Sequence, residues 1–185
     1  MKSFRIALFT LILSSCQLNS YHIDGFAREA CEGDTVCMCQ DTSLQGAISV
    51  TVVENGKFTF VGDTDTMAVY RIFLKKAPEH SVTFFLEAGR TTVELSPLAA
   101  GNRVSGTMIN NEWQQLNDSI RLLGREIVRL VQQQATDSLT QQLQVKAVKR
   151  LHHRMSDCIL NTAQRNRSNI LGQYILKNYK APEFD

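Results

Sequence analysis

The sequence predicts an α+β protein, in which an antiparallel β-sandwich or open barrel precedes a helical hairpin and a short C-terminal helix. Two observations predict this class. Up to residue 106, short apolar runs rich in β-branched and aromatic residues alternate with turn signals. Beyond residue 106, the apolar residues recur with the three-four spacing of a helix. The 185 residues, 43% hydrophobic and 21% charged, suffice for one medium domain or two small ones.

Seven or eight short strands are expected before residue 106. Two of the runs are separated by Asn55 and Gly56, a pair that favours a hairpin turn because both residues adopt positive φ readily. Strands of this number and spacing are typical of an antiparallel sandwich or an open barrel. The runs cover residues 21–27, 36–39, 47–53, 58–61, 69–74, 82–86, 91–95 and 103–105.

A first helix of about six turns is predicted after residue 106. Asn110 is expected to cap it, and Glu112 lies in its first turn. Its apolar stripe could dock on the sheet, pair with a second helix or form a coiled-coil dimer. Because the stripe is short and lacks matched flanking charges, packing within the chain is favoured. The stripe consists of Trp113, Leu116, Ile120, Leu123, Ile127 and Leu130.

Two further helices are predicted. The 135–138 segment interrupts the pattern and supplies a cap for the second helix, and the third helix covers residues 169–179. A row of basic residues on the second helix is expected to face solvent, with docking of an acidic partner or anionic lipid as the alternative. The apolar face of the second helix is Leu139, Leu143, Ala147, Leu151, Met155 and Cys158, and its basic row is Lys146, Arg150 and Arg154.

The first residues have the layout of a secretory signal. Lys2 and Arg5 form a positive region, and the apolar stretch over residues 6–13 is too short to cross a bilayer as a helix. The segment from Leu13 to Cys16 resembles a bacterial lipobox, in which small residues permit cleavage and the cysteine thiol receives a diacylglyceryl group. We therefore expect lipidation of Cys16, which would attach the protein to a membrane.

This organisation divides the chain into four parts. They are a lipoprotein signal peptide over 1–15, a lipidated tether over 16–20, a β-sandwich domain over 21–106 and a helical region packing on the sheet over 107–185. In similar lipoproteins an Asp directly after the lipidated cysteine retains the protein at the inner membrane. Gln17 stands there in this chain, and no acidic cluster follows. We expect the protein in the cell envelope, at the periplasmic face of the outer membrane.

The charge pattern argues against nucleic-acid binding. Removal of Lys2 and Arg5 with the signal lowers the 20 basic residues to the number of acidic ones, 18. The charges are uneven, because residues 16–106 contain 11 acidic and 7 basic residues whereas residues 107–185 contain 7 and 11. Opposite charges on the two halves are consistent with two subdomains that pack together.

Three cysteines lie close together in the strand region: Cys31, Cys37 and Cys39. In a strand, Cys37 and Cys39 project from the same face, so a disulfide between them would be strained. A turn over residues 32–34 could bring Cys31 to either of them, and an envelope location permits such a disulfide. Without a disulfide, these residues would act as small core hydrophobes.

The sequence predicts no metal site, cofactor or catalytic residue. It contains no C-x-x-C, the usual dithiol redox motif. A zinc site usually needs four ligands, and the cysteines are accompanied only by His22 and Asp residues without ligand-like spacing. No nucleophile-base pair or phosphate-binding loop is recognisable.

Three segments carry a resemblance to a known family: VVENGKFTFVGDT over 52–64, FFLEAGRTTVEL over 84–95 and VSGTMINNEW over 104–113. They resemble the N-terminal domain of unknown function found on envelope lipoproteins of Gram-negative anaerobes, over residues 21–113. In many of those lipoproteins, this domain precedes a thioredoxin-like or peroxiredoxin-like thiol-disulfide interchange domain. The weaker similarity continues to RNRSNILGQYILKNY over 165–179, the segment that leads into the redox domain.

The resemblance implies a non-catalytic module, because the redox domain and its C-x-x-C are missing from the sequence. We therefore expect an envelope lipoprotein that binds or positions a protein partner in the periplasm. The alternative is a redox accessory, in which Cys31, Cys37, Cys39 or Cys158 exchanges thiols with a separate thioredoxin-like protein. The sequence leaves the oligomeric state open.

Overall fold

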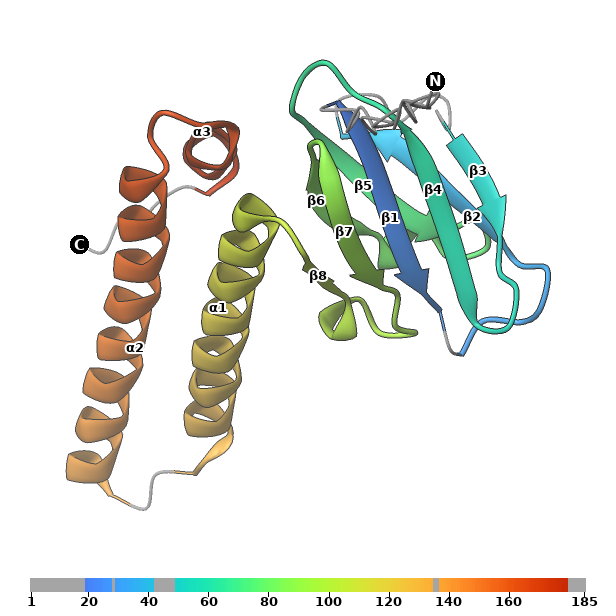
Figure 1. The fold of residues 1–185 in the computed structure, drawn as a ribbon. Helices are drawn as coiled ribbons and strands as arrows, with labels where there is room; N and C mark the ends of the chain where they lie inside the picture. The colour runs from blue at the N-terminus through green and yellow to red at the C-terminus, as the bar shows by residue number, and fades with distance from the viewer. Residues whose placement is uncertain (1–18, 28, 42–48, 135–136, 180–185) are drawn as a thin grey trace, which may run out of the picture.

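The computed structural model describes residues 19–27, 29–41, 49–134 and 137–179 (Figure 1). Within these ranges, strands come first and helices follow, in the order that the sequence predicts. The strands are β1 (Ser20–Phe26), β2 (Thr35–Gln40), β3 (Ser49–Val52), β4 (Lys57–Asp63), β5 (Ala68–Leu74), β6 (Val82–Leu86), β7 (Gly89–Glu94) and β8 (Arg103–Ser105). The helices are α1 (Met108–Gln132), α2 (Ser138–Arg165) and α3 (Ile170–Asn178), with short 3-10 turns η1 (Pro78–His80) and η2 (Ala99–Gly101).

The strands form two four-stranded sheets that face each other, with orders β4-β1-β7-β8 and β3-β2-β5-β6. Neither sheet closes into a barrel, so the predicted α+β class is confirmed in its sandwich form. One strand pair departs from a purely antiparallel arrangement, because β1 and β7 are parallel. The chain crosses directly from β6 in one sheet to β7 in the other, and Gly89 therefore enters beside Tyr21, at the start of β1.

The Asn55-Gly56 pair forms the expected tight turn but not the expected hairpin. Both residues have positive φ, 52° and 70°, and Glu54 and Lys57 exchange two backbone hydrogen bonds across the turn. The strands on either side belong to different sheets: β3 pairs with β2, and β4 pairs with β1. The turn therefore moves the chain from one layer of the sandwich to the other, which allows both Val53 and Phe58 to be buried.

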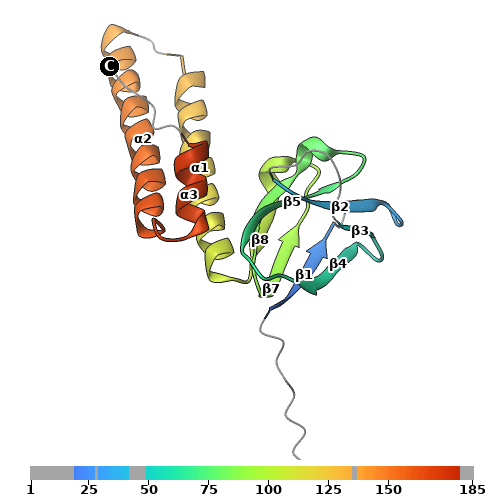
Figure 2. The ribbon, with the colours of Figure 1, turned by 90° about the horizontal axis from the view of Figure 1, so that it is seen from above.

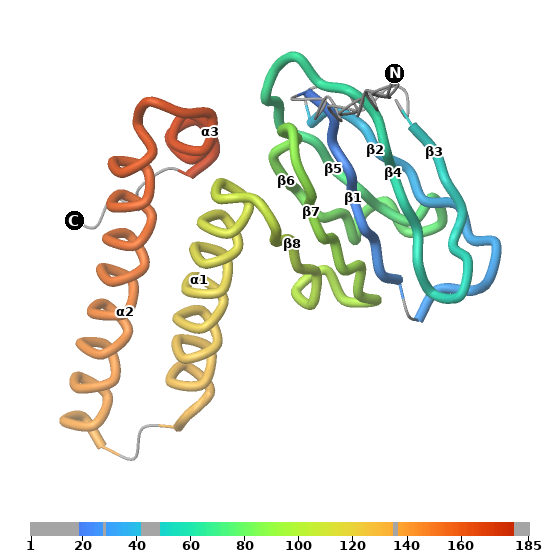
Figure 3. Tube along the Cα trace, in the orientation of Figure 1, coloured from blue at the N-terminus to red at the C-terminus, as the bar shows by residue number. Residues whose placement is uncertain are grey.

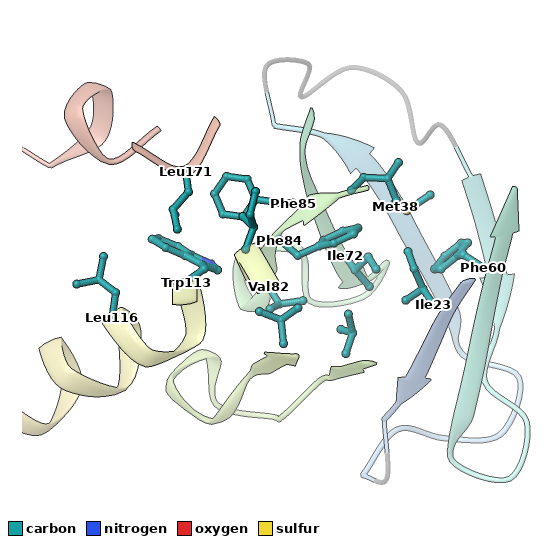
Figure 4. Close-up of a cluster of buried hydrophobic side chains, with 14 of the residues drawn as sticks. Ile23, Met38, Phe60, Ile72, Val82, Phe84, Phe85, Trp113, Leu116 and Leu171 are labelled. Atoms are coloured by element: carbon teal, nitrogen blue, oxygen red, sulfur yellow. The ribbon is translucent and has the colours of Figure 1, made fainter. Parts of the chain in front are cut away.

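The space between the sheets is filled by side chains from both layers (Figure 4). Burying large aliphatic and aromatic side chains is the main source of stability in such a sandwich. The most deeply buried residues include Ile23, Val36, Ile72, Phe84 and Val93, each 0% exposed. The same cluster continues through Phe85 and Trp113 to Leu171 and Ile175 in α3. The strands and the near end of the helices thus share one core.

Of the two predicted helix caps, one is confirmed and one is wrong. The Asp137 carboxylate, in the predicted 135–138 segment, accepts a hydrogen bond from the Thr140 backbone at the start of α2. Asn169, where the third helix was predicted to start, caps α3 in the same way. The cap of α1 is Thr107, whose hydroxyl accepts from the Asn110 backbone. Asn110 lies in the first turn instead, because its side chain is fully buried against the sandwich.

The two long helices lie side by side as a hairpin that meets the sandwich at one end only (Figures 1 and 3). The first turns of α1 contact β6 and β8, and α3 packs beside α2 at the same end. Seen from above, the far half of the hairpin projects away from the sheets (Figure 2). No helix among the described residues has the length and apolar character needed to cross a membrane.

The apolar face predicted for α2 is only partly buried. Its later residues, Ala147, Leu151, Met155 and Cys158, are half-buried, and Met155 and Cys158 pack against the core. Its first two residues, Leu139 and Leu143, are instead 66% and 59% exposed. Near the tip of the hairpin, Gln144 faces α1 and donates from Nε2 to the Gln133 carbonyl, 2.9 Å away. A polar contact therefore joins the two helices near the tip, and the two leucines are left at the surface.

The first turn of α1 provides hydrogen-bond partners for the backbone groups at the free edge of β6. The Asn110 Oδ1 atom accepts a hydrogen bond from the Phe85 backbone, and its Nδ2 atom donates to the Phe85 carbonyl, each at 2.8 Å. The side-chain amide thus takes the place of a neighbouring strand. One turn further along α1, the Trp113 ring nitrogen donates to the Thr83 carbonyl at 2.9 Å.

The edge of β8, in the other sheet, is satisfied by the same helix. Gln114 Oε1 accepts from the Val104 backbone at 2.8 Å, and Asn111 Oδ1 accepts from the Gly106 backbone at 3.0 Å. Gly106 has φ of 116°, and a Cβ there would lie 2.3 Å from the Arg90 carbonyl oxygen. We call Asn110, Asn111, Trp113 and Gln114 the edge plug. It joins the free edges of both sheets to one helix.

An aromatic cluster surrounds the edge plug. Trp113 makes edge-to-face contacts with Phe85, Tyr174 and Tyr179, with ring centroids 5.9, 5.5 and 6.2 Å away. Such pairs contribute about 0.5–1.5 kcal/mol each beyond the area they bury. Burial raises the pKa of both the Tyr174 and the Tyr179 hydroxyl. The cluster connects α3 to β6 through α1.

Replacement of Asn110 by Ala should destabilise the fold by about 3 kcal/mol, because two buried backbone groups of Phe85 lose their partners. Urea unfolding followed by circular dichroism measures this as a lower midpoint. Gln115 is the matched control: it is an exposed amide on the same helix, and its replacement by Ala should change stability by less than about 0.5 kcal/mol. Equal midpoints for the two variants would show that the edge plug is not needed.

The raised tyrosine pKa values predict a loss of stability in alkali. In the unfolded chain these hydroxyls ionise near pH 10, before they do so in the folded protein. The unfolded state therefore binds fewer protons above that pH, so stability falls as pH rises through about 10. Thermal unfolding between pH 8 and pH 11 should show a steeper fall for the natural chain than for Tyr174→Phe. Parallel curves would contradict the assignment.

Candidate functional site

Cys31 is an exposed thiol in the turn that leads into β2. The turn is held by the Asp34 carboxylate, which accepts from the Cys31 backbone at 2.7 Å and from Lys76 Nζ at 2.6 Å. These contacts hold the pKa of the Asp34 carboxyl below its usual range, the bond from Lys76 being the main cause. A cationic and an anionic group thus lie beside this cysteine.

Cys37 and Cys39 lie within β2 and are each 5% exposed. Burial raises the pKa of the Cys37 thiol, which keeps it protonated and weakly nucleophilic. All four cysteines of the described residues are free thiols, so the disulfide considered for Cys31 is not present. The physical reason is that the Cys31–Asp34 turn leaves Cys31 at the surface, whereas both strand cysteines point into packed surroundings.

The other cysteines and the histidine considered in the sequence analysis do not come together in a common site among the described residues. Cys158 is half-buried on α2, and Cys16 lies outside the described residues. The imidazole of His22 pairs with the Asp24 carboxylate at 3.0 Å, and Arg90 binds the same carboxylate. Among the residues that the structure describes, no three His, Cys, Asp or Glu side chains gather where they could hold a metal ion.

The strands and three of the four edge-plug residues lie within a known sequence family. The family model described as a domain of unknown function (DUF4369) matches residues 21–113. The chain belongs to this family. No curated protein and no solved structure matches the chain. The match agrees with the resemblance seen in the sequence, over the same residues.

The limits of the DUF4369 match have a structural meaning. It begins at Tyr21 in β1 and ends at Trp113, the residue of α1 that bonds to the edge of β6. The VSGTMINNEW segment, which carries part of the resemblance, contains two of the three residues of β8 and three residues of the edge plug. The family therefore comprises the sandwich together with the helical turns that cover its free edges.

Most of the helical hairpin lies beyond the DUF4369 match, and it carries much of the exposed apolar surface. Aliphatic side chains at least half exposed stand on both helices. They are Leu122, Val128 and Val131 on α1 and Leu139, Leu143 and Val145 on α2. Among them, Leu139 and Leu143 are one turn apart on the same face of α2, and neighbouring exposed apolar residues can mark an interaction surface.

A shallow groove of about 530 Å³ lies between the end of α1 and the start of α2. We call it the tip groove. Leu130, Leu143 and Ala147 supply its apolar lining, and polar amides and a hydroxyl complete it. Those polar residues are Gln133, Gln134, Thr140 and Gln144. This groove is the candidate binding site of the molecule.

The tip groove and the edge plug were not predicted as sites. A signal for the plug existed, since Asn110 and Gln114 stand one helical turn apart beside the apolar stripe. The signal for the groove was the basic row next to the leucines of the second helix. Neither pattern by itself distinguishes a contact surface from a solvated face.

Thiol labelling tests the burial of the cysteines. At neutral pH, maleimide should modify Cys31 rapidly, whereas Cys37 and Cys39 should react at least about 100-fold more slowly because they require local opening. Mass spectrometry at successive times, with and without urea, measures these rates. Cys31→Ser should remove the fast event. Rapid labelling of either strand cysteine in the folded protein would contradict the arrangement.

Proposed function

We propose that the chain is a non-catalytic lipoprotein of the bacterial envelope that presents a binding surface to a protein partner in the periplasm. One observation carries the proposal: the hairpin is fixed to the sandwich by its near end only, and its far half projects with exposed aliphatic residues (Figure 2). A helix pair built only to complete the core would bury those residues against the sheets.

The positions of the two ends favour this role. β1 starts at the end of the sandwich drawn at the top of Figure 1, whereas α1 ends and α2 begins at the bottom (Figure 1). A lipid at Cys16 would hold the start of β1 near the membrane. The tip groove would then lie on the side away from the bilayer. An α-helix as long as α1, 25 residues, extends about 37 Å.

The family membership is consistent with a supporting role. In many of the lipoproteins that the sequence resembles, this domain precedes a separate thiol-disulfide interchange domain, and that second domain supplies the C-x-x-C motif. A module of that type would hold a partner protein at the periplasmic face of the outer membrane. Such a module needs a stable scaffold and an exposed binding surface. The edge plug stabilises the scaffold, and the hairpin provides the exposed surface.

A second function is favoured by the exposure of Cys31. As a redox accessory, its thiolate would attack the disulfide of a thioredoxin-like partner, form a mixed disulfide and release one partner thiolate. Lys76 and Asp34 beside Cys31 would provide the polar surroundings of that exchange. This function requires Cys31 to be reactive in the folded protein, and it fails if maleimide does not label that residue.

Fractionation of cells tests the anchoring. The natural chain should sediment with the membranes, and Cys16→Ser should move it to the soluble periplasmic fraction, because the acyl chains supply the membrane affinity. Cys31→Ser is the control and should stay with the membranes. If Cys16→Ser sediments as the natural chain does, the lipoprotein function is wrong.

A further inference from the structure

The tip groove is bordered by unpaired positive charge. On α2, Lys146 and Arg150 follow Leu143 and Ala147 by three residues each, so every basic residue lies next to an apolar one on the helix surface. Arg154 extends this basic row beside Leu151. All three basic side chains are exposed, and among the described residues no ion pair engages them.

The helix α1 contributes a second basic border. Leu122, Arg125 and Arg129 are spaced by three and four residues and are all exposed. Arg129 is partly neutralised by Glu126, with Nη2 and Oε1 2.6 Å apart, whereas Arg125 has no such partner in the described residues. Both helices of the hairpin thus combine exposed leucines with arginines.

The acidic half of the chain does not neutralise these charges. Residues 16–106 contain 11 acidic and 7 basic residues, the reverse of residues 107–185. The sandwich nevertheless contacts only the near end of the hairpin, where Asp118 binds Arg103 and Arg121. The charges at the far end therefore remain available to another molecule.

We propose that the tip groove binds an acidic amphipathic helix of a protein partner. Its leucines would pack between Leu130, Leu143 and Ala147, and its carboxylates would pair with the basic rows at Arg125 and Arg150. This inference names the partner chemistry of the proposed binding function and rests on that function.

Two other occupants fit less well. A second copy would bring identical basic rows together, which the like charges oppose. An anionic membrane would meet a surface without aromatic anchors, since the sequence has no Phe, Trp or Tyr from residue 114 to residue 173. The groove is also concave and lies between two helices, a shape that suits a third helix.

Fluorescence anisotropy with synthetic helical peptides tests the proposal. The acidic probe has leucines at heptad positions a and d and glutamates elsewhere, with about 20 residues or 30 Å of helix. The basic probe has lysines in place of the glutamates. The full chain should bind the acidic probe at least about 10-fold more tightly than the basic one, and added salt should weaken the binding.

Variants locate the binding site. Arg150→Glu with Arg154→Glu should weaken binding of the acidic probe by about 10-fold, and Leu143→Gln should do the same through lost apolar contact. Lys57→Glu with Lys177→Glu changes the net charge equally at distant exposed positions and should have no effect. Leu176→Gln is the matched apolar control, at 64% exposure on α3.

Three outcomes would overturn the proposal. They are equal binding of the two probes, equal effects of the groove and control variants, and binding to anionic vesicles with none to the peptide. Concentration-dependent dimerisation that Leu143→Gln abolishes, without peptide binding, would assign the groove to a second copy instead. Because none of these measurements depends on lipidation of Cys16, they are independent of the Cys16 fractionation.

Discussion

Two hydrogen bonds between the Asn110 side chain and the Phe85 backbone determine how the two halves of this protein are joined. An open sandwich leaves free backbone groups at the edges of its sheets, and such edges are prone to pairing with other chains. The edge plug uses amides of α1 to satisfy β6 and β8 together. The first turns of α1 are thereby fixed against the sandwich. The orientation of α1 in turn sets the orientation of the hairpin that it forms with α2.

The junction also explains why the family match includes the start of a helix. A sandwich that stopped after β8 would leave Phe85 and Val104 with unpaired backbone groups, whose burial costs about 1–3 kcal/mol each. Trp113 adds apolar area and a hydrogen bond at the same place. The first two turns of α1 therefore belong to the sandwich in energetic terms, while the rest of the hairpin is free to serve another purpose.

The sequence predicted the parts of the fold that local patterns determine. Alternating apolar residues located the strands, and Asp137 and Asn169 marked the starts of α2 and α3. Properties that depend on distant partners were missed. The Asn55-Gly56 turn has the expected geometry, yet which sheet each flanking strand joins depends on β1 and β2. The predicted apolar face of α2 is half-buried from Ala147 to Cys158, but the leucines near the tip, which no other element covers in the described residues, are exposed.

The place of β1 in its sheet has a mechanical consequence. β1 is an inner strand, paired along its length with β4 on one side and β7 on the other. A pulling force applied to the start of this strand runs along its axis, so both ladders of hydrogen bonds are loaded in shear and share the load. An edge strand pulled away from its single neighbour would instead break its hydrogen bonds one after another. A domain whose first strand lies inside a sheet is therefore suited to stay folded when tension is applied to its amino-terminal end.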